Sequence, residues 1–455
     1  MKFRRSLIAV TAFAVASTAG AVAPANAASI NGGGASFMAN MMDICAAQYN
    51  RNTQYNPDKH VVTYASVGSS SGQSGFKNGT YTFGGSESAY SSGAPADLVY
   101  VPLVGGPIAI GYRLDALKPA GATMRLNGEV IAKIFAGQIT KWNDPAIVAL
   151  NKGATTKKKL RVSKGGVTVT AKKVASNVQF TVSMTAAAAK KYRNAKVTIT
   201  AATVGGATKS ILNSKYRKRI TKNAAYVRNT TYTIKAGRTN LGVLAVAPVT
   251  NGVKLTLPDQ TIRVVHRSDG SGTTNNFANY LNKSYPSIWT KATNNSFTTA
   301  FPGTVPTDGS FQSARGNEGV SSYVRDNDGS ITYAEPSFLD ERSVKYADVL
   351  NPGGQYVKPT PVSSASWFEG AEVTAEGLVS QSFTYKAADA YPINAISYGL
   401  TSSASSTNNA LTKGFFSYFL NQCSPKAAPG AGYTPLTGKI LEKALVQLAK
   451  VNGGA

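Results

Sequence analysis

The hydrophobic pattern of residues 261–274, TIRVVHRSDGSGTT, predicts a strand that runs into a small polar turn and then into a helix. Residues 262–265 form a β-branched run, which suits a strand. After the turn, Phe277, Tyr280 and Leu281 recur at helical spacing. We therefore expect the turn to lie where a strand ends and a helix begins.

This turn has the chemistry of an anion-binding site. The first N–H groups of a helix have no partner within the helix, and the helix dipole adds partial positive charge there. Arg267 could add a planar fork of donors for phosphate or carboxylate oxygens. Ordinary helix capping explains the same residues, so the motif alone leaves both interpretations open.

A hydrolase interpretation of the turn is weaker. Ser271, Asp269 and His266 are residue types of a catalytic triad. Triad side chains normally come from separate segments so that they can converge, which three positions within one turn cannot easily do. The G-x-S-x-G sequence of a nucleophile elbow is also missing. We therefore expect no enzymatic activity.

The same order of strand, small polar turn and helix occurs twice more near the start of the chain. Residues 29–37 read SINGGGASF, with a hydroxyl at Ser36, and residues 38–49 follow with helical spacing. Residues 61–64 form a second apolar run, and the turn after it contains Ser69. Ligands of open α/β sheets bind at the carboxyl ends of strands, so three such turns favour a binding site over three unrelated caps.

Length and the first residues bear on organisation and location. A chain of 455 residues is too long for one ordinary core and predicts two or three domains. Residues 1–27 have the basic start, the apolar stretch and the A-x-A ending of a secretory signal peptide. Since the cleavage point carries no cysteine and no later segment is apolar enough for a membrane span, we expect an exported protein without a lipid anchor.

The chain has two cysteines, Cys45 and Cys423. In an oxidising compartment an even pair predicts a disulfide, and two buried thiols are the alternative. A disulfide would require the two ends of the mature chain to share a domain. Two cysteines and two histidines argue against a zinc site, and we expect no cofactor.

Several segments together resemble the phosphate-binding protein of bacterial Pst-type ABC transporters. They occur in that family's order and include GGGASF, GSSSG, FGGSES, IFAGQITKWNDP, VVHRSDGSGTT, GNEGVSSYVRDNDGSITYAEPSFL and YPINAISYGL. The resemblance implies an α/β, two-lobed type II periplasmic-binding-protein fold. Residues 28–105 and 391–455 would form lobe one, with Cys45 and Cys423 together in it, and residues 106–153 and 252–390 would form lobe two.

The resemblance also implies a set of phosphate contacts. Ser36, Phe37 and Ser69 match the first two loops, and Ser271, Gly272 and Thr273 match the third, with Arg267 as the cation and Asp269 as its partner. Glu87 stands where the family has an aspartate. A carboxylate accepts the proton of hydrogen phosphate but repels sulfate, which has no proton to donate. Because Glu87 is one methylene longer, we expect affinity or selectivity to differ from the family's, unless this glutamate lies on the surface.

Residues 154–251 interrupt the family pattern. They contain 20 lysines and arginines and no acidic residue, so they carry most of the net charge of +26. Apolar positions alternate in residues 167–170, 178–182 and 196–200, and again at Tyr232 and Ile234, which predicts an inserted small all-β domain of the sandwich type. Its basic residues could bind an anionic envelope polymer, or they could be a solvated spacer; no motif indicates specific nucleic-acid binding.

These features together predict an exported, monomeric solute-binding protein. It would capture inorganic phosphate between its lobes and deliver it to the permease of a membrane ABC transporter. The alternative is an envelope adhesion or scaffold protein that uses the same fold together with the basic residues 154–251 to bind anionic polymers.

Overall fold

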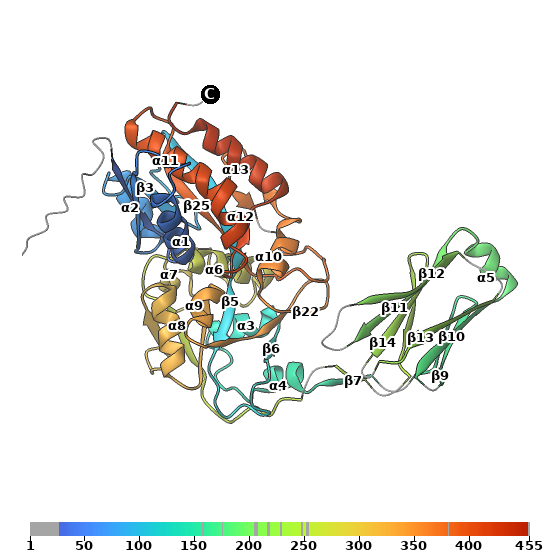
Figure 1. Cartoon of the computed structure of the whole chain (residues 1–455). Coiled ribbons are helices and arrows are strands. Elements are labelled where there is room, and N and C mark those ends of the chain that lie inside the picture. The colour runs from blue at the N-terminus through green and yellow to red at the C-terminus, as the bar shows by residue number, and fades with distance from the viewer. Residues whose placement is uncertain are drawn as a thin grey trace, which may run out of the picture.

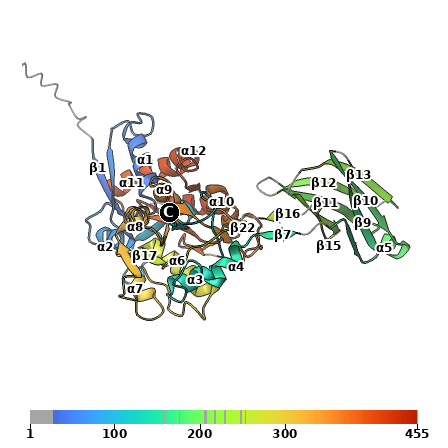
Figure 2. The ribbon, with the colours of Figure 1, turned by 90° about the horizontal axis from the view of Figure 1, so that it is seen from below.

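The computed structural model describes residues 27–453, apart from residues 157–158, 175, 204–207, 216–218, 228–229, 247–248, 252–253 and 381. The body of the chain has two lobes, each built on one β-sheet with helices packed around it, and a separate all-strand arm extends from the second lobe (Figures 1 and 2). The predicted signal peptide lies outside the described residues except for Ala27. No helix within the described ranges has the length and apolar character needed to cross a membrane.

Lobe one is organised around a six-stranded sheet of order β2-β1-β3-β25-β4-β26. The first three strands are parallel, and β25 is antiparallel to both β3 and β4. In chain order the strands are β1 (Ser29–Gly34), β2 (Val61–Ser66), β3 (Phe83–Ser86), β4 (Leu98–Pro107), β25 (Asn394–Ser402) and β26 (Thr434–Pro435). Its helices are α1 (Ala39–Asn50), α2 (Ser69–Lys77), α11 (Thr407–Tyr418), the π-helix η1 (Phe419–Cys423), α12 (Ser424–Ala427) and α13 (Gly438–Lys450).

Lobe two is organised around a five-stranded sheet of order β18-β17-β19-β5-β20. Its strands are β5 (Ala109–Tyr112), β17 (Arg263–Arg267), β18 (Phe311–Ala314), β19 (Ser330–Ala334) and β20 (Lys345–Tyr346). Its helices are α3 (Gly128–Phe135), α4 (Pro145–Asn151), α6 (Gly272–Ser284), α7 (Phe297–Ala300), α8 (Gly316–Asp326) and α9 (Pro336–Asp340). A small sheet of β6 (Arg125–Leu126), β21 (Asp348–Leu350) and β22 (Tyr356–Val357) lies beside it.

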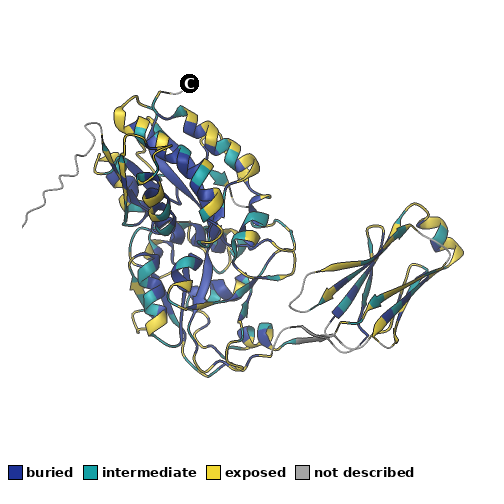
Figure 3. Cartoon of the chain, viewed as in Figure 1, coloured by how far each residue is buried: buried dark blue, intermediate teal, exposed yellow. Residues whose placement is uncertain are grey.

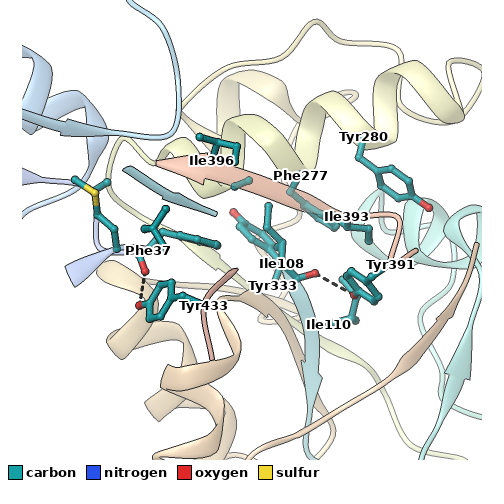
Figure 4. Packing of buried hydrophobic residues seen from close by; sticks show 14 of the residues in the cluster. Phe37, Ile108, Ile110, Phe277, Tyr280, Tyr333, Tyr391, Ile393, Ile396 and Tyr433 are labelled. Atoms are coloured by element: carbon teal, nitrogen blue, oxygen red, sulfur yellow. Dashed lines mark hydrogen bonds between the residues drawn. The ribbon is translucent and has the colours of Figure 1, made fainter. Parts of the chain in front are cut away.

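The chain passes between the lobes at two adjacent points. β4 ends at Pro107 and β5 begins at Ala109, so Ile108 alone separates the two sheets. The Ile108 N–H donates to the Ile393 carbonyl at 2.8 Å, and the Tyr391 hydroxyl donates to the Ile108 carbonyl at 3.0 Å (Figure 4). Two short buried crossings held side by side are the geometry of a hinge.

The exact division between the lobes stays a prediction. Helix α10 (Pro361–Phe368) packs against β4 and β26 of the first sheet. The small hairpin of β23 (Glu372–Val373) and β24 (Val379–Ser380) contacts α13. Part of the segment 252–390 therefore touches lobe one, so contacts between the lobes are not confined to the two crossings.

The predicted disulfide between Cys45 and Cys423 is present. It joins α1 to the end of η1, and the two Cα atoms are 5.7 Å apart. Both cysteines are buried within the core of lobe one. The bond closes a loop of 378 residues that includes all of lobe two and the arm.

The arm has the strands that the alternating pattern predicts. Two four-stranded antiparallel sheets, β13-β10-β9-β8 and β12-β11-β14-β15, enclose a core separate from that of the lobes (Figure 3). The strands are β8 (Arg161–Lys164), β9 (Val167–Val174), β10 (Asn177–Met184), β11 (Lys196–Thr203), β12 (Lys209–Lys215), β13 (Arg219–Ala225), β14 (Thr230–Ala236) and β15 (Thr239–Leu244). The pair β7 (Ala154–Thr156) and β16 (Val249–Asn251) joins the arm to lobe two.

One element of the arm differs from the all-β expectation. Helix α5 (Ala186–Lys191) connects the two sheets between β10 and β11. A run of four alanines favours a helix, and the Thr185 hydroxyl caps it by accepting from the Ala188 N–H at 3.3 Å. The sequence pattern did not predict this helix, because alanine is compatible with the alternating apolar and polar positions of a strand.

Removing the disulfide is expected to destabilise lobe one. The double substitution Cys45→Ala and Cys423→Ala should lower the free energy of unfolding by about 2–5 kcal/mol, because the unfolded chain loses a long-range constraint. Urea denaturation followed by circular dichroism measures this change. A reductant should destabilise the wild type and leave the variant unaffected; equal responses would contradict the assignment.

Candidate functional site

The three loops singled out in the sequence meet where the lobes face each other. Ser36 follows β1, Ser69 begins α2, and Ser271 precedes α6. The Gly272 N–H of lobe two donates to the Ser69 hydroxyl of lobe one at 3.0 Å. A second contact between lobes is the Asn317 N–H, which donates to the Ser36 hydroxyl at 3.1 Å. The loops therefore form one cluster with contributions from both lobes.

Two glycines allow this close approach. A Cβ on Gly272 would lie 2.6 Å from the Ser69 hydroxyl oxygen and 2.8 Å from the Glu87 N atom, which is too close for a real contact. Gly68 has φ of +91°, and a Cβ there would lie 2.3 Å from a carboxylate oxygen of Asp269. Glycine is needed at both positions, and at Gly68 the backbone conformation requires it as well.

The third loop forms the start of helix α6. The Ser271 hydroxyl caps α6 by accepting from the Thr274 N–H at 3.1 Å. The Thr273 hydroxyl is fully buried and has no hydrogen-bond partner among the described residues. A buried hydroxyl without a partner is costly, and Thr273 is one of several such side chains among the described residues.

Arg267 and Asp269 form the ion pair that the sequence suggested. The Arg267 Nε donates to Asp269 Oδ1 at 2.7 Å, and its Nη2 donates to Oδ2. Asp269 Oδ1 also accepts from the Gly316 N–H at 3.1 Å. Burial alone would raise the pKa of the Asp269 carboxyl, but the hydrogen bonds and charge of Arg267 hold it below its usual value. The guanidinium is thus fixed in place and largely neutralised.

Glu87 lies inside this cluster and is 4% exposed, so it is no surface glutamate. Its two carboxylate oxygens accept from hydroxyl groups, Oε2 from Ser69 at 3.3 Å and Oε1 from Ser397 on β25 at 3.0 Å. Burial raises the pKa of Glu87 to about 7, against the opposing effects of the Ser397 hydrogen bond and the Arg267 charge. Its protonation therefore changes close to neutral pH.

The side chain of Phe37 packs in the hydrophobic core. Its side chain is completely buried, and its carbonyl accepts from the Tyr433 hydroxyl at 2.6 Å (Figure 4). The backbone of the first loop is therefore held by a residue near the other end of the chain.

Three polar residues of the cluster were not predicted from the sequence. Asn317 accepts from Arg267 Nη1 at 3.3 Å through its Oδ1, whereas its buried Nδ2 has no partner among the described residues. Asn276 donates to the Glu87 carbonyl at 2.7 Å, and Ser397 donates to the Glu87 side chain. Asn317 and Ser397 lie in the segments GNEG and YPINAISYGL that carried the resemblance, but only the fold shows that they reach the site.

A cleft of about 670 Å³ opens beside Glu87. Asn276 and Asn279 of α6 line one side, and Tyr398 and residues of the 378–384 segment line the other. The exposed Lys283 stands in the lining, so a cation lies at this approach to the cluster.

The imidazole and hydroxyl of the hydrolase interpretation are engaged elsewhere. The His266 ring stacks on Phe297 with centroids 4.2 Å apart, and its Nδ1 lies 3.0 Å from the Arg267 carbonyl oxygen. Ser271 caps α6. Within the described ranges, no group of three His, Cys, Asp or Glu side chains is placed to hold a metal ion.

The family comparison agrees with this architecture. The family model described as "PBP superfamily domain" matches residues 19–243 and 239–422, which together span most of the chain. The chain belongs to the PBP superfamily.

Relatives of this PBP-superfamily protein share moderate identity with it. It is 26% identical over 436 residues to "Phosphate-binding protein PstS" of Haemophilus influenzae, covering 93% of each chain. It is 24% identical over 427 residues to the protein of the same name from Pasteurella multocida, covering 92% of this chain and 90% of that one. For two relatives of the same name from Xylella fastidiosa, the chain spans 63% of their length.

Solved structures show the same fold at low sequence identity. A periplasmic phosphate-binding protein, PfluDING, bound with phosphate, aligns with a TM-score of 0.55 and 19% identity over 92% of this chain and 93% of that one. The phosphate-binding protein from Stenotrophomonas maltophilia aligns with a TM-score of 0.52 and 17% identity, covering 91% and 92%. The predicted two-lobed periplasmic-binding-protein fold is therefore confirmed.

Two buried carboxyls should make stability depend on pH. Glu87 titrates at about 7, and burial raises the pKa of Glu335, the N-cap residue of α9, to about 8. Both pKa values exceed the unfolded value of 4.5, so the folded state holds the extra protons. The contribution of these two carboxyls to the free energy of unfolding should therefore be greatest below pH 4.5. It should fall as the pH rises through their pKa values.

Urea denaturation between pH 5 and pH 9 tests this expectation. Glu87→Gln should remove the part of the decrease that ends near pH 7, about 3 kcal/mol, and Glu335→Gln the part that extends to about pH 8, about 4 kcal/mol. A pH profile that is unchanged in both variants would show that these carboxyls are ionised in the folded protein.

Proposed function

We propose that this protein is an exported solute-binding protein that captures inorganic phosphate between its two lobes. The observation that carries the proposal is the buried cluster of unused donors around Arg267, with the single carboxylate of Glu87 among them. The unpartnered Thr273 hydroxyl and Asn317 Nδ2 are the donors that an oxyanion would satisfy. The names of the relatives support phosphate as that anion.

Directed hydrogen bonds would do most of the binding. The starts of α2 and α6 would supply backbone N–H groups, and Ser36 and Thr273 would supply hydroxyls, whereas the Ser69 hydroxyl donates to Glu87. Arg267 is already paired with Asp269, so a dianion would meet little uncompensated positive charge. Because the donors come from both lobes, the ligand would link them and favour closure about the hinge.

Glu87 would set the selectivity. An ionised carboxylate accepts the proton that hydrogen phosphate still carries, and it repels sulfate, which has none. The Ser69 and Ser397 hydroxyls keep the longer glutamate side chain within the cluster. Since its pKa is about 7, the discrimination against sulfate should be strongest at alkaline pH.

The remaining proposals concern partners and location. Delivery of phosphate would require the permease of a membrane ABC transporter, and a monomer with one site is sufficient for this task. Export through the predicted signal peptide, without a lipid anchor, would place the protein outside the cytoplasm. The binding loops are all present, which favours solute capture over a purely adhesive or scaffolding role in the envelope, and over catalysis.

Isothermal titration calorimetry tests the proposed function directly. Phosphate should bind with one site per chain at micromolar concentration or tighter, and sulfate should bind much more weakly at pH 8. Absence of phosphate binding in this range would overturn the proposal.

Glu87→Gln is expected to reduce the selectivity for phosphate over sulfate. The glutamine amide can donate to either anion, so the ratio of the two dissociation constants should fall by about tenfold or more. Calorimetry with both anions measures the ratio, and Glu129→Gln, which changes an exposed glutamate of α3, is the control. An unchanged ratio would show that Glu87 does not receive the ligand's proton.

Asn317→Ala should weaken phosphate binding by about tenfold, because a buried donor to a charged group is lost. Asn327→Ala, at the opposite end of α8, is the matched control, since its side chain only donates to the Tyr323 carbonyl. A phosphate-bound crystal structure should place Asn317 Nδ2 within 3.5 Å of a phosphate oxygen. Wild-type affinity in Asn317→Ala would mean that another group satisfies this amide.

A further inference from the structure

Several exposed cations of the arm lie together at the end farthest from the lobes. We define the basic tip as six exposed cations at that end: Lys164, Lys190, Lys191, Arg193, Lys196 and Lys215. The strand pair β7–β16 marks the attached end, and α5 marks the opposite end in both views (Figures 1 and 2). We propose that the basic tip binds a linear, phosphate-rich polyanion.

The fold brings these six residues together from four elements. The β8–β9 turn carries Lys164, and it contacts α5 because the Thr185 N–H donates to the Gly166 carbonyl at 2.9 Å. Lys190 and Lys191 end α5, and Arg193 follows it. These segments are separate in sequence, so their meeting at one end is a property of the folded arm.

Lys196 and Lys215 complete the tip from the second sheet. They stand directly opposite each other on the antiparallel strands β11 and β12. Like charges at directly opposed positions destabilise a sheet. Nothing within the arm offsets this repulsion, because residues 154–251 contain no acidic residue.

The tip's charge is also unpaired with the rest of the protein. None of the ion pairs formed by described residues involves a residue of the arm. Lys190 and Lys191 gain some stabilisation from the end of α5, where cations are favoured. Lys196 and Lys215 have no such local explanation, which points to an external anionic partner.

The surface chemistry favours a flexible polymer over a membrane. The large exposed apolar residues of the described arm are Leu160, Val174 and Val227, and each lies toward the attached end. Among the described residues, the tip therefore has no large exposed apolar side chain to insert between lipids, as membrane-surface binding normally requires.

Nucleic acid is also a poor fit to the tip. Base recognition on single strands depends on exposed aromatic side chains, and among the described residues beside the tip cations the aromatic Tyr192 is 6% exposed. Ammonium and guanidinium groups spread around a convex end suit a chain that carries closely spaced charges and can bend around it. Phosphate groups linked in a chain have this property, and release of their counterions would drive binding.

The test compares two variants of the full chain with equal changes of charge. The tip variant carries Lys190→Gln, Lys191→Gln, Arg193→Gln and Lys215→Gln. The control variant carries Arg161→Gln, Lys172→Gln, Lys209→Gln and Lys222→Gln, which are exposed cations elsewhere on the arm. Fluorescence anisotropy with labelled long-chain inorganic polyphosphate gives the affinity, with saturating inorganic phosphate present so that the lobe site does not contribute.

The wild type should bind polyphosphate with a strong salt dependence. The tip variant should bind at least tenfold more weakly and reduce the slope of log affinity against log salt by about three, because four cations are lost. The control variant should lose less than threefold. Equal losses in both variants would overturn the proposal, since net charge alone would then explain binding.

Three further probes can each contradict the proposal. Vesicles of anionic phospholipid that bind as tightly as polyphosphate would identify a membrane surface instead. Single-stranded DNA or polygalacturonate binding equally well would remove the preference for a phosphate polymer. An unchanged circular dichroism spectrum and urea midpoint would show that the tip variant is folded, and this readout does not involve phosphate, so the test stays independent of the proposed function.

Discussion

The contact between Gly272 and Ser69 is the constraint on which the site depends. The Gly272 N–H reaches the Ser69 hydroxyl across the boundary between lobes, and a single methyl group at this glycine would collide with that oxygen and with Glu87. Only because the backbones approach this closely can the starts of α2 and α6 meet. The side chains have different roles. Asp269 neutralises Arg267, and the Thr273 hydroxyl and the Asn317 amide remain as donors for a ligand.

The hinge and the disulfide lie farther from the site and hold the segments that make this contact. Ile108 and Ile393 are hydrogen-bonded neighbours at the two crossings, which is the geometry of a hinge. The disulfide fixes α1, which follows the first binding loop, to the C-terminal helices of the same lobe. Tyr433 then holds the Phe37 carbonyl from these C-terminal residues. One face of the site is thus held rigid while the other can close upon it.

Much of this could be predicted from local patterns. The strands before Ser36, Ser69 and Ser271 and the helices after them were visible as β-branched runs, small turns and helical spacing, because these signals depend on neighbouring residues. The Asn317 and Ser397 contacts depend on how distant strands are ordered, and no local signal encodes that order. The pKa of Glu87 was equally hidden, since it is caused by burial that only the closed fold creates. Helix α5 was not predicted, because its alanines fit both the alternating pattern of a strand and the spacing of a helix.

The arm and the lobes differ in how their charged residues are arranged. At the loop cluster of the lobes, the charges are few and buried, and Arg267 is paired with Asp269, so geometry decides what binds. In the arm, charge is abundant, exposed and unpaired, so density and salt decide. The two parts have separate cores, which allows each function to vary without disturbing the other.

The most direct test of the central claim is a crystal structure of the protein grown with phosphate. We predict one phosphate ion enclosed between the lobes, with oxygens within hydrogen-bond distance of the Thr273 hydroxyl and Asn317 Nδ2, and with Glu87 facing its protonated oxygen. An empty cluster at saturating phosphate, or an ion held only by the arm, would contradict it.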